Sequence, residues 1–275
     1  MLIIIKFKIA CLSYNCIMNK KQLKILLDKK LELYNQLSFV ELDPISIPHS
    51  FSKQQDIEIA GFFAAIFSWG NRTIIINKSK ALIQRMDNAP YDFCINYSAK
   101  DLQQLTNFKH RTFNTEDIVH LVRFMQHHYT TNKSLETAFT KWMNPKDETV
   151  ENALKGFRDY CFSITDSSER TKKHISTPAN GSHCKRLNMF LRWMVRKDNN
   201  GVDFGIWEKI KPSQLIMPVD VHVARVAERL GIMDGSKINW DTAVALTQYL
   251  KAFDKEDPVK YDYALFGAGV MEKNL

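Results

Sequence analysis

The sequence LIMPVDVHVARVAERLGI, residues 215–232, predicts a helix with both ends marked. Pro218 stops the preceding segment, because its ring removes a backbone donor and keeps the residue before it extended. Asp220 stands at the N-cap position, where a carboxylate can accept hydrogen bonds from the free N–H groups of the first turn, and Gly231 ends the helix at a position that favours a left-handed backbone. The apolar residues between them recur with the spacing of one core-facing helix face: Val223, Val226, Ala227 and Leu230.

Length and composition predict a folded, all-α protein. The 275 residues suffice for one large domain or two smaller lobes, and 45% hydrophobic and 25% charged residues is an ordinary globular composition. Glycines and prolines are few, and no pair of alternating apolar runs is joined by a hairpin turn, which excludes a turn-rich β protein. The five cysteines are scattered without a C-x-x-C pair. This pattern fits a reducing cytoplasm, and we expect neither a metal nor another cofactor.

The chain is basic, with a formal net charge of +8 and a sequence pI near 9.1. This balance favours a polyanionic partner such as nucleic acid, but only modestly, since a solvated surface accounts for it as well.

Residues 1–17 form a short apolar stretch that Lys6 and Lys8 interrupt. The stretch is shorter than a membrane span and lacks the small-residue cleavage site of a signal peptide. We interpret it as a start-site extension with Met18 as the expected start, and we expect a cytoplasmic protein without a membrane partner.

Residues 18–275 are expected to form a single helical domain, with an N-terminal helical lobe over about 18–165 and a second lobe over about 178–275. A polar loop, 166–178, joins the two lobes. Apolar spacing predicts helices over most of the remaining chain: 20–37, 56–69, 72–86, 99–105, 115–127, 135–143, 149–162, 182–197, 239–253 and 259–270. Residues 88–91 are predicted to form a turn.

The predicted helix 182–197, with Ser182 as its cap, has two contrasting faces. One face is apolar and is expected in the core: Leu187, Phe190, Leu191 and Met194. The opposite face is a basic stripe: Lys185, Asn188, Met189, Arg192 and Arg196. Such a stripe is either a solvated surface or a line of contacts to nucleic-acid phosphates.

Four segments together resemble known proteins: 181–196 (GSHCKRLNMFLRWMVR), 202–207 (VDFGIW), 218–227 (PVDVHVARVA) and 257–267 (DPVKYDYALFG). The third resembles the catalytic-aspartate segment of the helix-hairpin-helix DNA glycosylase superfamily, which includes endonuclease III and the 8-oxoguanine glycosylases. More closely, from about residue 18 onward, the chain resembles an uncharacterised conserved family of Bacteroidetes that is distantly related to those enzymes.

The resemblance implies a two-lobed helical fold with a cleft that binds double-stranded DNA as a monomer and takes up a flipped base. Lys185 would be the nucleophile that forms a Schiff base, and Asp220 would stabilise the oxocarbenium-like transition state. The DNA-binding residues would be Ser182, Arg186, Arg192, Arg196, His222 and Arg225. The chain departs from the superfamily in lacking a Leu-Pro-Gly-Val-Gly hairpin and a cluster of four cysteines.

Two other functions remain open at this stage. If Asp220 is only a helix cap, the chain is a non-catalytic nucleic-acid-binding protein on the same fold. If the positive charge is incidental, it is a helical scaffold for protein interactions.

Overall fold

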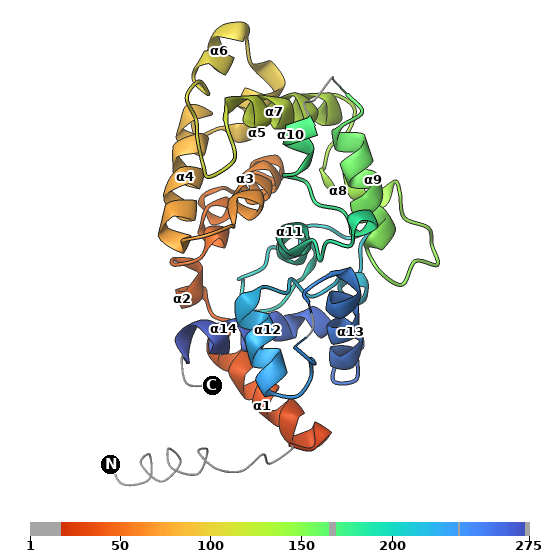
Figure 1. Ribbon diagram of the computed structural model, residues 1–275. Coiled ribbons are helices and arrows are strands. Elements are labelled where there is room, and N and C mark those ends of the chain that lie inside the picture. Colours follow the sequence, from red (N-terminus) through yellow and green to blue (C-terminus); the bar gives the residue numbers. More distant parts are fainter. Residues whose placement is uncertain (1–17, 165–168, 236, 273–275) are drawn as a thin grey trace, which may run out of the picture.

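The computed structural model describes residues 18–164, 169–235 and 237–272, so the prediction for residues 1–17 lies outside the described residues. The described part is helical and has no strand, only an isolated bridge between His110 and Phe113. The all-α prediction is confirmed for this part of the chain (Figure 1). Its α-helices are α1 (Lys20–Tyr34), α2 (Leu37–Val40), α3 (Gln54–Phe67), α4 (Arg72–Arg85), α5 (Pro90–Asn96), α6 (Ala99–Gln103), α7 (Thr115–Tyr129), α8 (Glu136–Thr140), α9 (Glu151–Cys161), α10 (Glu169–Lys172), α11 (Lys185–Val195), α12 (Val221–Arg229), α13 (Trp240–Lys251) and α14 (Tyr261–Met271).

The capping predictions near the C-terminal end are confirmed. Asp220 is the N-cap of α12, and its Oδ1 accepts hydrogen bonds from the backbone N–H groups of His222 and Val223 at 2.8 and 3.0 Å. Gly231, just past α12, has a φ of 68°, in the left-handed region. The helix predicted over 239–253 is α13, which Asn239 caps, and Asp241 lies within its first turn.

Two local predictions were wrong. The expected turn at 88–91 contains the start of α5, because Pro90 occupies the first helical position, where a missing N–H costs no hydrogen bond. The helix expected from Ser182 begins at Lys185 instead. Cys184 adopts a left-handed backbone with φ 48°, which a continuous α-helix does not allow.

Helix α3 is the centre of the core. It is buried from Ile57 to Phe67 and packs against α11, where the rings of Phe62 and Phe190 lie 5.6 Å apart, edge to face. The same helix carries Glu58, whose carboxylate is fully buried. Its Oε1 accepts a hydrogen bond from the indole N–H of Trp207 at 2.7 Å, and its Oε2 accepts one from the Tyr129 hydroxyl at 2.6 Å. Helix α11, which carries the predicted lysine, is therefore held against a rigid support.

The first helix packs with the last helices of the chain. Helix α1 lies along α14, which in turn packs against α12, as Figure 1 shows at the lower end of the molecule. The contact is close because Gly267 leaves room for the ring of Tyr34, which would lie 2.3 Å from a Cβ at that position. Helix α1, although it lies in the N-terminal part of the chain, therefore packs with a C-terminal helix.

Gly269 allows the same close approach between α14 and α12, and its substitution is expected to be destabilising. A Cβ at this position would lie 2.9 Å from the backbone carbonyl oxygen of His222, the second residue of α12. We expect Gly269→Ala to lower the free energy of unfolding in urea by about 1–2 kcal/mol, because overpacking outweighs the gain in helix propensity. Gly61→Ala in α3 is the matched control. There the nearest atom is the flexible end of Met194, at 3.0 Å, and we expect a change below about 1 kcal/mol. Equal losses for the two variants would contradict this account.

Helices long and apolar enough to cross a membrane are not found in the described residues.

Candidate functional site

The structure brings Lys185 and Asp220 together although they lie far apart in the sequence. Lys185 is the first residue of α11, Asp220 caps α12, and the Lys185 Nζ lies 4.0 Å from the Asp220 Oδ2. Both side chains are mostly buried, with 21% and 18% of their surfaces exposed. Each begins or caps a helix that is packed in the core, so the position of the pair is determined by the backbone rather than by a flexible loop.

Both residues line a cavity of about 910 Å³. This volume is within the range of about 300–1,000 Å³ that is usual for small-molecule sites. The wall is largely apolar and draws on elements from distant parts of the sequence. Its aromatic and sulfur-containing side chains are Phe39, Trp69, Met189, Tyr263 and Phe266. Trp69 is 48% exposed, which is unusual for so large an apolar side chain, and the guanidinium of Arg111 lies 4.2 Å from its ring.

Four further cations line the same cavity: Arg72, Lys173, Arg186 and Arg192. Arg72 lies over the ring of Phe266 at 5.3 Å. Arg186 donates to the backbone carbonyl of Ile66 at 2.6 Å, and its burial lowers the pKa of its guanidinium. The cavity is thus apolar in lining and positively charged in its surroundings, which suits an aromatic ligand attached to an anionic chain.

The other predicted DNA-binding residues around α12 have different environments. Ser182 and His222 line the cavity. The Ser182 Oγ accepts from the backbone N–H of Cys184 at 3.2 Å and so caps the turn before α11 rather than the helix. The His222 Nδ1 lies 3.3 Å from the carbonyl oxygen of Gly269, to which the exposed Arg225 also donates. His222 and Arg225 therefore link α12 to α14.

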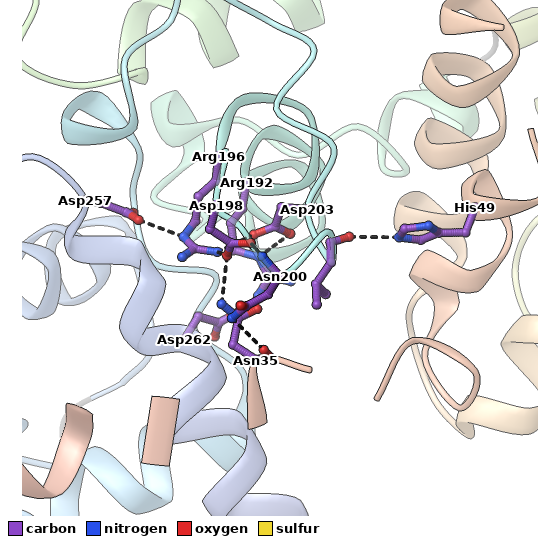
Figure 2. Close-up of polar contacts among 10 residues, drawn as sticks. Asn35, His49, Arg192, Arg196, Asp198, Asn200, Asp203, Asp257 and Asp262 are labelled. Atoms are coloured by element: carbon purple, nitrogen blue, oxygen red, sulfur yellow. Dashed lines mark hydrogen bonds and ion pairs between the residues drawn. The ribbon is translucent and has the colours of Figure 1, made fainter. Parts of the chain in front are cut away.

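The basic stripe predicted on α11 is not a surface, and this is the main correction to the sequence analysis. Arg192 and Arg196 are 7% and 3% exposed, because the side of α11 that carries them faces aspartates from later segments (Figure 2). Arg192 pairs with Asp262 and, through Nε at 3.4 Å, with Asp203. Arg192 and Arg196 therefore belong to a buried ion-pair cluster rather than to a solvated surface, whereas Lys185, at the start of the stripe, pairs with Asp220.

Arg196 completes this cluster. Its guanidinium binds three carboxylates, Asp198 at 2.6 Å, Asp203 at 3.0 Å and Asp257 at 2.8 Å. Burial acts against the charge of both arginines, but the surrounding carboxylates raise the pKa of each guanidinium. The cluster also holds the C-terminal end of α1, because the side-chain amide of Asn35, the C-cap of α1, donates to the Asp198 carboxylate at 2.7 Å (Figure 2).

Sequence reasoning assigned no role to Asp262 and did not consider Asp203. The sequence holds one signal for this pairing, which is that the charges of the arginines and of the later aspartates can balance. Two arginines four residues apart are followed by aspartates at 198, 203, 257 and 262, enough to neutralise both. Which of these aspartates lies beside an arginine depends on where α14 lies relative to α11 in the folded protein. No local sequence pattern predicts that position.

The family model described as "Protein of unknown function (DUF2400)" matches residues 43–271. The chain belongs to this family. The match spans α3, α11, α12 and α14, so this DUF2400 protein has Lys185, Asp220 and Asp262 inside the matched region. No curated protein and no solved structure matches the chain.

Proposed function

We propose that this DUF2400 protein is a DNA glycosylase-like enzyme that excises a damaged base, with Lys185 as the nucleophile and Asp220 as the electrostatic partner. The observation that carries the proposal is the 4.0 Å approach of the Lys185 Nζ to the Asp220 Oδ2 at the wall of a cavity. Water alone stabilises the charge of a lysine on a solvated surface, so such a lysine would not need a carboxylate like that of Asp220 beside it.

The two groups suit the two requirements of base excision. Breaking an N-glycosidic bond gives C1′ oxocarbenium character, which a nearby carboxylate stabilises. An amine then bonds to the same carbon, and a Schiff base follows in lyase-type enzymes. The Asp220 Oδ1 is occupied by two backbone N–H groups, so its Oδ2 is the oxygen that faces Lys185 and a reacting sugar.

The cavity wall suits a flipped base. An extruded base needs apolar or aromatic surfaces to replace the stacking that it loses. Phe266 and Tyr263 of α14 and Met189 of α11 supply such surfaces beside Lys185. Trp69 is exposed by 48%, and Arg111 lies over its ring.

The cations that would hold the DNA strand differ from those expected on the stripe. Arg72 and Lys173 line the cavity, and the exposed Arg111 stacks on Trp69. Phosphate contacts position a duplex without reading its sequence, and exposed cations around a base pocket meet that need. Arg111 and Lys173 therefore replace Arg192 and Arg196 as the expected phosphate contacts.

Borohydride trapping tests the proposal directly. Duplex oligonucleotides with 8-oxoguanine, uracil, an oxidised pyrimidine or an abasic site are incubated with the protein and the reductant, which converts a Schiff base into a stable amine. We expect a covalent adduct for the wild type and none for Lys185→Ala, because the nucleophilic amine is absent. Lys100→Ala is the matched control, since Lys100 is an exposed lysine of α6 that does not line the cavity, and this variant is expected to leave the adduct unchanged.

The same experiment separates the alternatives. DNA binding without adduct or base release in the wild type would favour a non-catalytic binding protein, in which Asp220 is only a cap. An adduct that persists in Lys185→Ala and disappears in Lys173→Ala would move the nucleophile to Lys173.

A further inference from the structure

Asp262 is a third carboxyl group at the cavity. It is the second residue of α14, is 5% exposed, and lines the cavity together with Lys185 and Asp220. Its Oδ2 accepts from the Arg192 Nη1. Its Oδ1 is buried and has no hydrogen-bond partner among the residues that the structure describes.

The position of this unpartnered oxygen distinguishes Asp262 from the other carboxylates. The buried Oδ1 atoms of Asp203 and Asp257 also lack a hydrogen-bond partner among the described residues, but neither residue lines the cavity. In Asp220, the Oδ1 accepts from two backbone N–H groups, and the Oδ2 lies 4.0 Å from the Lys185 amine. Buried carboxylate oxygens are nearly always hydrogen-bonded, and one left open at a cavity wall marks a place for a ligand atom or a proton.

Burial favours the protonated form of Asp262. Burial raises the pKa of Asp262 to about 7; Arg192 opposes the rise, and the negative charge of Asp220 adds to it. Arg192 does not fully compensate the charge, because it is shared with Asp203 at 3.4 Å. The charges that act most strongly on Asp262 are those of Arg192, Asp220, Lys185 and Asp203. The adjoining cavity wall also carries Asp43, Arg72, Lys173, His183, Arg186, His222 and Tyr263.

We propose that Asp262 is the acid of this cavity and donates a proton to the nucleobase that leaves when the N-glycosidic bond breaks. The inference rests on the proposed function. When the C1′–N bond breaks, its electron pair stays on the ring nitrogen, and the carboxyl O–H of Asp262 breaks to form the new N–H bond. The Lys185 amine supplies the electron pair that replaces the lost bond at C1′ and releases its surplus proton to water. The Asp262 carboxylate left behind is stabilised by the charge of the Arg192 guanidinium and then regains a proton from solvent.

The proposed proton transfer favours substrates whose damaged base is neutral. A neutral base such as 8-oxoguanine or uracil would leave as an anion and gains from a proton donor. A cationic base such as 7-methylguanine leaves neutral without one. Two carboxyl groups in one site, one protonated and one paired, form the arrangement by which enzymes divide acid catalysis from electrostatic stabilisation.

The test compares Asp262→Asn with the wild type in single-turnover excision between about pH 5.5 and about pH 8.5, which brackets the expected titration. Duplexes carry 8-oxoguanine, uracil or 7-methylguanine. For the neutral bases we expect the wild-type rate to fall above about pH 7, and the rate of Asp262→Asn to be about 10²–10⁴-fold lower and flat with pH, because the amide cannot give up a proton. The release of 7-methylguanine is expected to be the same for both proteins.

Asp257→Asn is the matched control, since Asp257 pairs with Arg196 in the same cluster but does not line the cavity. It is expected to keep the wild-type pH profile. Carbon-13 NMR titration of labelled aspartates adds a readout without substrate. A carboxyl that titrates near pH 7 is expected in the wild type and is expected to be missing in Asp262→Asn.

The outcomes separate the two proposals. An active wild type with an unchanged rate and pH profile in Asp262→Asn overturns the acid role and leaves the glycosylase proposal standing. A wild type that releases none of the bases overturns both. Aspartates that all titrate below about pH 5, within their usual range, overturn the acid role whatever the activity.

Discussion

Replacement of Asp220 by asparagine is expected to slow base excision by about 10²–10³-fold while folding and DNA affinity stay close to the wild type. In the proposed mechanism the reaction loses the negative charge that would face C1′ beside the Lys185 amine, and removing one such electrostatic group costs about this much. Folding is spared because asparagine is as good an N-cap as aspartate, so the hydrogen bonds to His222 and Val223 can persist. Single-turnover excision, urea unfolding and a binding titration measure the three quantities.

Asp241→Asn is the control for this variant. Asp241 is an exposed acid in the first turn of α13, so the change in charge is the same but lies away from the cavity. It is expected to leave the excision rate unchanged. An excision rate in Asp220→Asn within a factor of two or three of the wild type would remove Asp220 from the chemistry and leave it as a helix cap.

Replacement of Arg192 by alanine is expected to lower the free energy of unfolding by about 3–5 kcal/mol, as is typical when one partner of a buried ion pair is removed. Asp262 and Asp203 are then left buried without this cation, and the ring of Tyr263 loses the guanidinium that lies 4.3 Å from it. Denaturant unfolding followed by circular dichroism measures the loss.

Arg229→Ala is the matched control, because Arg229 is an exposed arginine in the last turn of α12. A surface position of this kind changes stability by less than about 0.5 kcal/mol. If Arg192→Ala were as stable as the control and instead bound DNA weakly with a reduced salt dependence, Arg192 would be a phosphate contact and the burial argument would be wrong.

The features that the sequence determined by itself are those that depend on near neighbours in the chain. The cap at Asp220, the left-handed Gly231 and the apolar face of α12 follow from helix geometry and the hydrogen-bonding needs of one turn. The helical class itself follows from apolar spacing and from the scarcity of glycine and proline.

The tertiary structure decided which residues face water and which meet. From the sequence, Arg192 and Arg196 were expected on an exposed stripe, either solvated or in contact with phosphates. Helical spacing shows which side chains share a face but not what covers it. Helix α14 and the segment 198–203 lie over that face, and their carboxylates cover and bury it. Helix α14 also places Asp262, which had no assigned role, at the cavity wall.

The approach of Lys185 to Asp220 could be expected only from the family resemblance, since no local rule joins residues on separate helices. It results from the packing of α11 on α3 and of α12 on α14, and Gly269 allows the second contact to be close. Local chain geometry thus determined the helices and their ends. Burial and long-range contact, which depend on how all helices share one core, determined the site.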